Sequence, residues 1–240
     1  MRRIYRKIRS RYGSSSYINR VTNEIAKQSL GYQILQPLMI EYPYLPFNGG
    51  ALRPFNISFL LNDIIINDRK IIVEFGSGIS TILISRLIKR NKLSCQLISI
   101  ESDLDWNKKL NRILEGEDVH HNTTIINAPL KEIETPFGIN NWYDFDDSIF
   151  LEKKIDLVIV DGPPAYLEEL KHSRYPALPK VHKFLSKNHM IYLDDTNRIG
   201  EKEVILRWEK DFDIKFNKDG SNYSTYISHE SFGTIPFQIK

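Results

Sequence analysis

Four short apolar runs in the sequence each carry an acidic residue at or next to their end. These acids are Glu74, Glu101, Asp161 and the pair Asp194–Asp195. Continuous apolar runs are typical of strands buried in a parallel sheet, and ligands of such sheets bind beyond the carboxyl ends of the strands. Carboxylates there can accept ribose hydroxyls, take a proton from a reacting group, or hold a hard metal ion.

A glycine-rich turn follows the first of these runs, in the stretch IIVEFGSGISTILI at 71–84. Gly76 and Gly78 can adopt conformations closed to other residues, and a helix expected from about Ser80 adds a partial positive charge. A dinucleotide fold uses the same device for a pyrophosphate, but its fingerprint needs a third glycine where this chain has Thr81. The turn alone therefore fits more than one cofactor.

Two glutamates favour one of these cofactors. Glu74, inside the turn, would repel a pyrophosphate but suits an ammonium group. Glu101, at the end of the second strand, can accept hydrogen bonds from both ribose hydroxyls. A ligand with a ribose, an ammonium group and no phosphate is S-adenosylmethionine. An acid at a strand end is also often only solvated, so the two glutamates together, rather than either alone, support this cofactor.

Five motifs along the chain resemble those of the class I, Rossmann-like S-adenosylmethionine-dependent methyltransferases. They are VEFGSGIST, ISIESD, INAPL, LVIVDGPP and MIYLDDTNR, within residues 50–228 and in the family's order. The resemblance implies that the glycine turn lines the methionine part of the cofactor, that Glu101 holds the ribose, and that Asn127 and Ala128 lie by the adenine. Ser80, where the family often has a third glycine, and Asn127, where it often has aspartate, are departures. The residues predicted to bind the cofactor are Glu74, Gly76, Ser77, Gly78, Ser80, Thr81, Glu101, Ser102, Asn127, Ala128, Asp161 and Gly162.

The acids after the fourth and fifth strands also resemble a metal site. Magnesium-dependent O-methyltransferases of the catechol and caffeoyl-coenzyme A type have an Asp after one of these strands and an Asp-Asn pair after the other. Here the positions hold Asp161, Asp194 and Asp195, and hard oxygen ligands suit Mg²⁺. Asp195 departs from the family's asparagine, and acids in neighbouring loops are often close together without a metal. The three aspartates are therefore an expected metal site, with the alternative that they lie close together and bind no metal.

Several residues near the strand ends are candidates for the acceptor side. Asp161, Asp194 and His172 are the predicted catalytic groups, although a lone histidine on a polar helix is usually a bystander. Trp142, Tyr143 and Asp144, in the long segment 129–153, are predicted to form a lid; alternatively, Trp142 anchors that segment to the core. Arg198 and Glu201 lie one helical turn apart and can pair. The residues predicted to contact the acceptor are Arg53, Tyr143, Arg174, Tyr175 and Arg198.

Strands alternating with helices predict a doubly wound α/β fold. We expect a mostly parallel seven-stranded sheet with a C-terminal antiparallel hairpin, formed by residues 212–217 and 221–228, and a helical N-terminal extension. A helix over 17–40 is expected to break at Gly31 and Pro37, and 165–185 is expected to be largely helical with interruptions at Pro176 and Pro179. The predicted divisions are a basic flexible tail at 1–16, the helical extension at 17–50 and a Rossmann-like methyltransferase domain at 51–240.

Composition excludes some classes of protein. The net charge of +3 is too small to indicate a specific nucleic-acid partner. A single cysteine, Cys95, favours a reducing compartment and hence the cytoplasm, and no apolar run is long enough to span a membrane. The basic N-terminal arm could touch a membrane surface or an acidic partner, or be a solvated tail.

These observations predict methyl transfer from S-adenosylmethionine to a small or medium acceptor, with oxygen the preferred site because the strand ends are rich in acids. Two alternatives stay open at this point: a nicotinamide-dependent oxidoreductase on a dinucleotide-binding fold, and a non-catalytic binding module. The identity of the acceptor, the need for Mg²⁺ and the oligomeric state are left open by the sequence.

Overall fold

The computed structural model describes residues 15–218, 222–228 and 231–236, and is built around a seven-stranded sheet. The strands are β1 (Ile71–Phe75), β2 (Gln96–Glu101), β3 (Thr123–Asn127), β4 (Leu130–Thr135), β5 (Gly138–Tyr143), β6 (Ile155–Val160), β7 (Leu185–Leu193), β8 (Asn217–Lys218) and β9 (Ser224–Ile227). The helices are α2 (Ser15–Leu35), α3 (Pro54–Ile66), α4 (Ile79–Arg90), α5 (Leu104–Gly116), α6 (Ala177–Val181) and α7 (Ile199–Phe212). Most of the predicted tail at 1–16 lies outside the described residues.

The sheet has the order β3-β2-β1-β6-β7-β9-β8. The first five of these strands are parallel, β9 is antiparallel to β7, and β8 is antiparallel to β9. The predicted fold class is therefore confirmed, including the antiparallel pair at the C-terminal end. Among the described residues, the first strand of that pair begins later than expected, at Asn217–Lys218, because α7 continues to Phe212.

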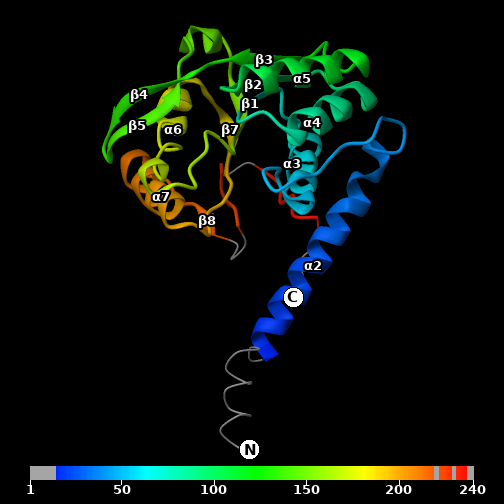
Figure 1. Ribbon diagram of the computed structural model, residues 1–240, viewed down its shortest axis with the longest axis horizontal. Coiled ribbons are helices and arrows are strands. Elements are labelled where there is room, and N and C mark those ends of the chain that lie inside the picture. The colour runs from blue at the N-terminus through cyan, green and yellow to red at the C-terminus, as the bar shows by residue number, and fades with distance from the viewer. Residues whose placement is uncertain (1–14, 219–221, 229–230, 237–240) are drawn as a thin grey trace, which may run out of the picture.

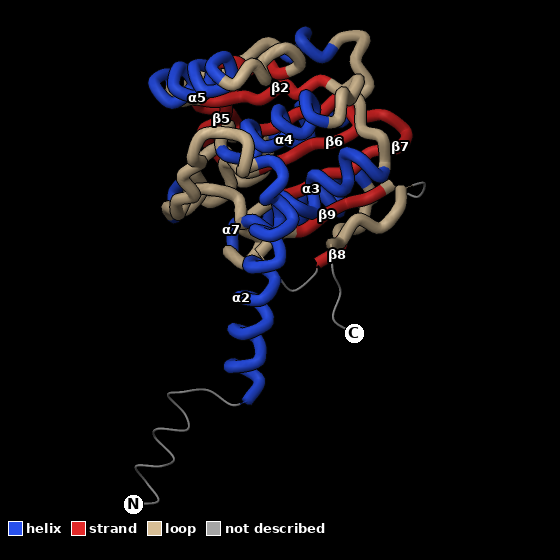
Figure 2. Tube along the Cα trace, turned by 90° about the vertical axis from the view of Figure 1, so that its right-hand side faces the viewer, coloured by secondary structure: helices blue, strands red, loops and turns tan. Residues whose placement is uncertain are grey.

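Side chains that alternate along the central strands divide the interior into two cores. Ile72 packs in one core with residues of α3, α4 and α5, while Val73 packs in the other with residues of α6, α7 and β5. Figures 1 and 2 show the helices on the two faces of the sheet. Because the carboxyl ends of β1, β2, β6 and β7 lie along one edge, the acids that follow them are brought to one side of the molecule.

The segment 129–153 differs from the irregular loop that was expected. Residues Leu130–Thr135 and Gly138–Tyr143 form an antiparallel hairpin of their own, β4–β5, followed by a short 3-10 helix at Asp147–Phe150. Gly138 has a φ of +92°, a conformation that glycine adopts easily, at the turn between the strands. The sequence pattern did not predict this hairpin, because its outer face is polar and its strands are not continuous apolar runs.

Two helix predictions were wrong. Helix α2 does not break at Gly31, which is where α2 packs directly against α3: a Cβ at this position would lie 2.3 Å from the backbone nitrogen of Phe55. The segment 165–185 is not largely helical, since its only α-helix in the described structure is the short α6, flanked by single 3-10 turns. Pro176 and Pro179 lack the amide hydrogens that a longer helix would need.

None of the helices in the described part of the chain combines the length and the apolar character needed to cross a membrane.

Candidate active site

A cleft with a volume of about 580 Å³ lies at the carboxyl edge of the sheet. Its walls come from the turn after β1, the end of β2, the ends of β6 and β7, and the loop that precedes α3. The predicted site residues that line it are Gly76, Ser77, Gly78, Ser80, Glu101, Ser102, Tyr143, Asp161, Gly162, Arg174, Asp194, Asp195 and Arg198. The structure therefore brings most of the predicted cofactor, acceptor and metal candidates to one place.

The glycine turn is held by close packing against the neighbouring strand end. Gly76 has a φ of +94°, and a Cβ on it would lie 2.8 Å from the backbone nitrogen of Gly162. That nitrogen donates a hydrogen bond to the carbonyl of Phe75 at 2.7 Å. Any side chain at Gly76 would therefore be strained and would push the two turns apart. Helix α4 then begins at Ile79, and Gly78, Ile79 and Ser80 at its start line the cleft.

Glu74 lies behind the turn rather than on the surface of the cleft. Its side chain is completely buried, and its two oxygens accept hydrogen bonds from the hydroxyls of Ser80, Thr81 and Ser99 at 2.5–2.6 Å. Burial raises the pKa of Glu74, and the three hydroxyls oppose that shift. The structure thus does not place this carboxylate where it would contact an ammonium group directly. Its observed contacts instead fix the start of α4 to β1 and β2, and Thr81 does not line the cleft either.

Glu101 borders the cleft beside the glycine turn. One carboxylate oxygen accepts the backbone amide of Ser77 at 3.1 Å, and the other accepts the amide of Asp103 at 2.7 Å. The residue is 8% exposed, and burial raises its pKa while these amides oppose the shift. Trp106 supports the same region, since its indole nitrogen donates to the carbonyl of Ser77 at 2.8 Å. A carboxylate in this position has accepting capacity left for a ligand's hydroxyl groups.

The two residues predicted to lie by the adenine are next to Glu101 but outside the cleft lining. Asn127 pairs with Glu101 across β2 and β3, and its side-chain nitrogen donates to the carbonyl of Glu101 at 3.3 Å. Ala128 is fully buried and donates its amide to the same carbonyl at 2.7 Å. Both residues hold the end of β2 in place in this structure.

At the other end of the cleft, four carboxylates gather around one buried guanidinium group. We call Asp161, Asp194, Asp195 and Glu201 the acidic cluster. Arg174, only 3% exposed, lies 3.2 Å from Asp195, 3.6 Å from Asp161 and 3.7 Å from Glu201. Its nitrogens also donate to three backbone carbonyls of the β6 and β7 ends, at 2.6–3.3 Å. Arg174 was predicted as part of an acceptor wall, and the structure shows that its guanidinium also joins the ends of two strands.

Asp194 and Asp161 have different surroundings within the acidic cluster. Asp194 Oδ1 accepts the hydroxyl of Tyr192 at 2.7 Å and the side-chain amides of Asn56 and Asn222 at 3.2 and 3.4 Å. Burial, followed by the neighbouring Asp195, raises the pKa of Asp194 to about 6. Burial and the charge of Asp194 raise the pKa of Asp161 well above its usual value, and Arg174 opposes that shift. Arg198 pairs with Asp195 at 3.0 Å and with Glu201 at 3.6 Å, as the sequence spacing suggested.

Three predicted site residues lie away from the cleft. His172 is hydrogen-bonded to Glu203 at 2.5 Å and stacks on Phe137, so it is in no position to move a proton in the cleft. Tyr175 donates its hydroxyl to Asp211 at 2.8 Å, on α7. Arg53 forms an exposed ion pair with Glu24 of α2 at 3.0 Å. Each of these side chains already has a partner on a neighbouring element that the sequence did not reveal.

Some residues of the cleft were missed by the sequence analysis. The stretch 49–52 before α3 forms part of the wall, as do Pro164 and Tyr166 in the loop after β6. Asn56, on the first turn of α3, reaches Asp194. The glycine pair at 49–50 was the one available signal, because glycines before a helix mark a loop that can approach a ligand closely.

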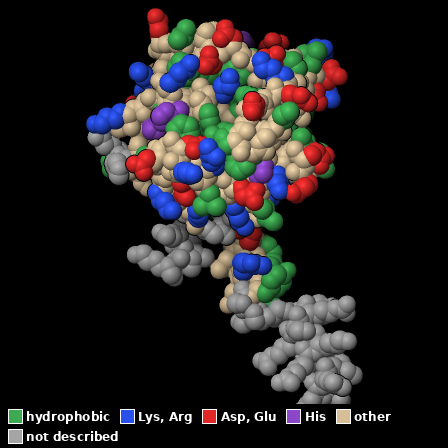
Figure 3. All heavy atoms as spheres, turned by 90° about the vertical axis from the view of Figure 1, so that its left-hand side faces the viewer, with side chains coloured by type: hydrophobic (Ala, Val, Ile, Leu, Met, Phe, Trp, Pro, Cys, Tyr) green, Lys and Arg blue, Asp and Glu red, His purple; other side chains and the backbone are tan. Residues whose placement is uncertain are grey.

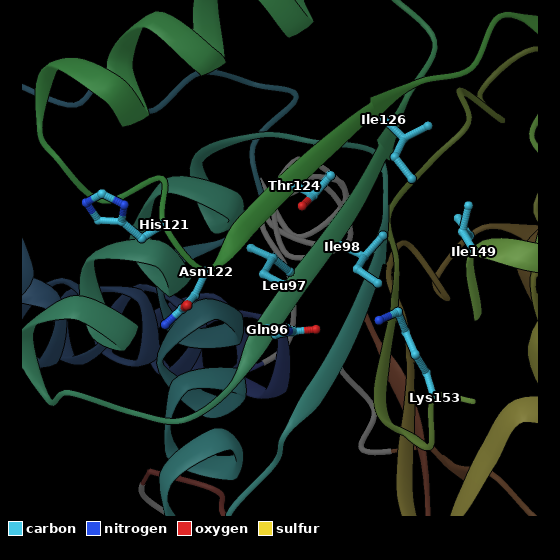
Figure 4. Close-up of a pocket in the computed structure, with 9 residues that line it drawn as sticks. All are labelled: Gln96, Leu97, Ile98, His121, Asn122, Thr124, Ile126, Ile149 and Lys153. Carbon is cyan, nitrogen blue, oxygen red and sulfur yellow. The ribbon is translucent and has the colours of Figure 1, made fainter. Parts of the chain in front are cut away.

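A smaller pocket of about 260 Å³ lies on the β2–β3 side of the sheet, and Figure 4 shows its lining. It holds none of the predicted site residues. His121, at its rim, is hydrogen-bonded to Asp118 at 2.9 Å, and the other oxygen of Asp118 accepts Lys89 at 2.8 Å. The carboxylate of Asp118 is thus already occupied by two neighbouring side chains.

The match to known protein families agrees with this geometry. Residues 73–196, just over half of the chain, match the family model described as a methyltransferase domain. The chain belongs to this methyltransferase family. The predicted enzyme class and the resemblance to class I S-adenosylmethionine-dependent methyltransferases are therefore confirmed, and the nicotinamide alternative is not favoured. No curated protein is significantly similar in sequence to the chain.

Solved structures of methyltransferases share the fold of this methyltransferase. The S-adenosylhomocysteine-bound methyltransferase PaMTH1 of Podospora anserina is 13% identical, with a TM-score of 0.60, and the alignment covers 90% of this chain and 96% of that one. An O-methyltransferase from Bacillus cereus in complex with S-adenosylhomocysteine is 12% identical, with a TM-score of 0.51 and coverage of 85% and 91%. At these identities the likeness establishes the fold.

The position of Trp142 predicts a structural rather than a gating role. Its side chain is 1% exposed and packs on Phe75 of β1 at a ring-centroid distance of 4.9 Å. Trp142→Ala is expected to lower the free energy of unfolding by about 3–5 kcal/mol, because it opens a large cavity in the core. Urea titration measures this loss, and Ile139→Ala, at a 70% exposed position on the same hairpin, is the matched control. A loss below about 1 kcal/mol, the range of a surface change, would restore the lid interpretation.

Proposed function

We propose that this methyltransferase moves the methyl group of S-adenosylmethionine to an oxygen atom of a small or medium-sized acceptor. The observation that carries the proposal is that the Glu101 carboxylate lines the same cleft as Gly76 and Gly78 of the glycine turn and as Asp161, Asp194 and Asp195 of the acidic cluster. When bound, S-adenosylmethionine supplies an electrophilic methyl group on a sulfonium centre. Structural relatives that bind S-adenosylhomocysteine, one of them an O-methyltransferase, support both the cofactor and the choice of oxygen.

On the cofactor side, the proposed roles follow the contacts of the wall. Glu101 accepts the two ribose hydroxyls, and Ser102 lies beside it. The backbone of Gly76, Ser77 and Gly78, which carries no bulky side chain, faces the methionine part. Glu74 acts indirectly, because its bonds to Ser80 and Ser99 fix the turn in the conformation that the ligand meets. Binding and orientation are the protein's main contributions, since the cofactor carries the chemical reactivity.

The charge balance of the cleft suits a positively charged cofactor. With every group ionised, the four carboxylates of the acidic cluster exceed the two guanidinium groups of Arg174 and Arg198 by two negative charges. A sulfonium and an ammonium group are attracted to such a site, whereas a pyrophosphate is repelled. The same excess of negative charge raises the proton affinity of the aspartates, which favours transfer of a proton from a nearby hydroxyl to one of them.

On the acceptor side, we assign proton removal to Asp161, with Asp194 as its supporting neighbour. Both line the cleft, and the pKa of each is raised above the usual range of an aspartate, which brings it closer to neutral pH. A base works best when its pKa is near the working pH. The side chain of Asp161 is 16% exposed and lies 3.6 Å from Arg174, whereas Asp194 already has three donors on Oδ1. Tyr143, Arg174 and Arg198 form the remaining wall.

The residues present do not match a magnesium centre of the catechol type. Asp161, Asp194 and Asp195 offer oxygens within 4.8 Å of one another, as a metal site would need. However, the guanidinium of Arg174 already lies among these carboxylates, and Asp194 Oδ1 is taken by three donors. We therefore propose that Arg174, rather than a metal ion, supplies the positive charge among these carboxylates.

Ligand titration tests the function. S-adenosylhomocysteine is expected to raise the melting temperature, because a ligand at about 100 times its Kd stabilises the folded form by about 2.7 kcal/mol. NAD at the same concentration is expected to give no shift, and added Mg²⁺ is expected not to change the response to S-adenosylhomocysteine. A shift with NAD and none with S-adenosylhomocysteine would refute the proposal.

A further inference from the structure

Helix α2 leaves the body of the molecule and carries hydrophobic side chains on an exposed face. Its C-terminal half packs on α3, while its N-terminal half projects away from the domain (Figures 1 and 2). Tyr17, Ile18, Val21 and Ile25 are between 38% and 62% exposed, and we call them the apolar stripe. Ile18, Val21 and Ile25 are three and four residues apart, so they share one face of the helix. Figure 3 shows hydrophobic side chains gathered along this projecting helix.

The side of α2 that faces α3 is already partnered, by polar groups toward the middle of the helix and by the buried Leu35 at its end. The carboxylate of Glu24 pairs with Arg53, and Gln28 accepts the backbone amide of Phe55 at 3.2 Å. Gly31 fits directly against the start of α3. The apolar stripe takes no part in these contacts. A helix whose docked side is already partnered, and which leaves four large apolar side chains in water, has a surface that another apolar phase would cover.

The charge of the N-terminal region is opposite to that of the rest of the chain. Residues 1–28 contain eight Lys and Arg side chains, six of them at positions 2–11, against the one carboxylate of Glu24, a formal balance of +7. The whole chain carries +3, so residues 29–240 carry −4. Arg20 lies on α2 itself, with its guanidinium 5.5 Å from the ring of Tyr17. Positive charge and exposed apolar side chains therefore occur together at one end of the molecule.

These two properties together discriminate between partners. A second copy of the chain would bring two segments of +7 side by side, and the stripe is shorter than the three to four heptads of a stable coiled coil. The phosphates of a nucleic acid would bind the basic side chains, but they have no apolar surface to cover the aliphatic side chains of Ile18, Val21 and Ile25. A bilayer with anionic headgroups satisfies both, because basic side chains bind the headgroups while the apolar face enters the acyl boundary.

We propose that the N-terminal half of α2, with the basic residues that precede it, binds the surface of an anionic lipid membrane. The apolar stripe lies in the interface, and the acidic body of the protein stays in the water, repelled by the headgroups. Attachment of this kind is peripheral and reversible, since the stripe buries only a few side chains. It is independent of the proposed chemistry, because the stripe contributes nothing to the lining of the cleft.

Co-sedimentation of the full-length protein with vesicles tests the proposal. We expect binding to phosphatidylcholine vesicles that contain about 30% phosphatidylglycerol, weak binding to pure phosphatidylcholine, and release when salt rises from about 0.1 M to about 0.5 M. The double variant Ile18→Asp, Ile25→Asp is expected to reduce binding at least about tenfold, because two charges would enter the acyl boundary. The matched control, Ile139→Asp with Leu151→Asp, changes two residues that are equally exposed elsewhere.

Four outcomes would overturn it. Equal binding of both double variants would show that charge alone is responsible. Failure of the wild type to bind the anionic vesicles would exclude a membrane as the partner of the apolar stripe. A dimer in light scattering that Ile18→Asp, Ile25→Asp abolishes, or tighter binding to a short RNA than to the vesicles, would assign the stripe to a different partner. Unchanged binding of S-adenosylhomocysteine by these variants keeps this test separate from that of the proposed function.

Discussion

Replacing Arg174 by alanine is expected to lower the free energy of unfolding by about 3–5 kcal/mol, because carboxylates are left without their buried counter-charge. The guanidinium is 3% exposed and contacts Asp161, Asp195 and Glu201 as well as three backbone carbonyls. Methyl transfer is expected to fall about 100-fold or more, the range seen when a fixed electrostatic group is removed from an active site. Urea titration and turnover with any accepted substrate measure the two effects.

The pH dependence separates this electrostatic role from simple loss of packing. Without Arg174, the pKa values of the neighbouring acids rise further, so the native state of the variant binds protons more tightly than the unfolded state. Stability then falls as pH rises, and the deficit of Arg174→Ala should be small near pH 5 and large near pH 8. Arg207→Ala, which breaks the exposed ion pair with Asp211 on α7, is the control and should cost less than about 1 kcal/mol at either pH. A deficit of equal size at both pH values would contradict the assignment.

Manganese provides a second readout of the same substitution, because it is detected without any substrate. Wild-type protein is expected to show no saturable binding of Mn²⁺ by electron paramagnetic resonance at millimolar concentration, since Arg174 occupies the space among the carboxylates. Removing the guanidinium releases oxygens of Asp161 and Asp195, and Asp194 still offers the oxygen that its three donors leave open, so Arg174→Ala should gain a site. Tight, stoichiometric binding of Mn²⁺ by the wild type would show that the metal interpretation of the three aspartates was right.

The sheet could be predicted from the sequence because each buried strand is a continuous apolar run of its own. The runs that contain Val73, Ile98, Val158 and Ile191 are bounded by turns and helices, and parallel connections leave few ways to order them. The carboxyl ends of these strands then place Glu101, Asp161 and Asp194 at one edge without further information. That edge is where the cleft lies, so the general location of the site followed from the strands alone.

The roles of individual site residues were harder to predict, because they depend on the face and the partners of each side chain. Glu74 points to the opposite face from Val73 and Phe75, and in the parallel register it meets Ser99 of β2. The hydroxyl of Ser80 donates a second hydrogen bond to Glu74, so this carboxylate is buried beneath the turn with its oxygens already partnered. Only the strand register, which the sequence does not give, shows that this glutamate has its donors already.

Arg174 shows a second kind of limit. On a helix, as first expected, its side chain would have pointed out from a regular surface. Because of the prolines at 176 and 179, this segment is irregular instead. The guanidinium of Arg174 reaches the ends of β6 and β7, where it donates to the carbonyls of Asp161 and Asp194 and lies within the acidic cluster. His172 and Tyr175, from the same segment, turn toward Glu203 and Asp211 of α7. The sequence motifs identified the acids of the cluster. Arg174, the cation among them, lies in a segment without a motif, so its role could not be predicted.

Glu101→Ala is expected to weaken binding of S-adenosylhomocysteine at least about 100-fold, as measured by calorimetry. Hydrogen bonds to a charged group contribute about 1.5–3 kcal/mol each, and the carboxylate is assigned two ribose hydroxyls. Part of the loss could arise from the turn, because Glu101 also accepts the amides of Ser77 and Asp103. Glu115→Ala, an exposed position on α5, is the control and should leave the affinity unchanged.

A ligand without the two hydroxyls distinguishes these contributions. The 2′,3′-dideoxy analogue of S-adenosylhomocysteine should bind the wild type as weakly as the natural ligand binds Glu101→Ala, and the variant should bind both ligands alike. That pattern requires a direct contact between carboxylate and ribose, since damage to the turn would weaken both ligands by the same factor in the variant and leave the wild type's preference intact. If Glu101→Ala retains the full preference for the hydroxylated ligand, the ribose lies elsewhere, and the assignment of the cofactor to this wall of the cleft is wrong.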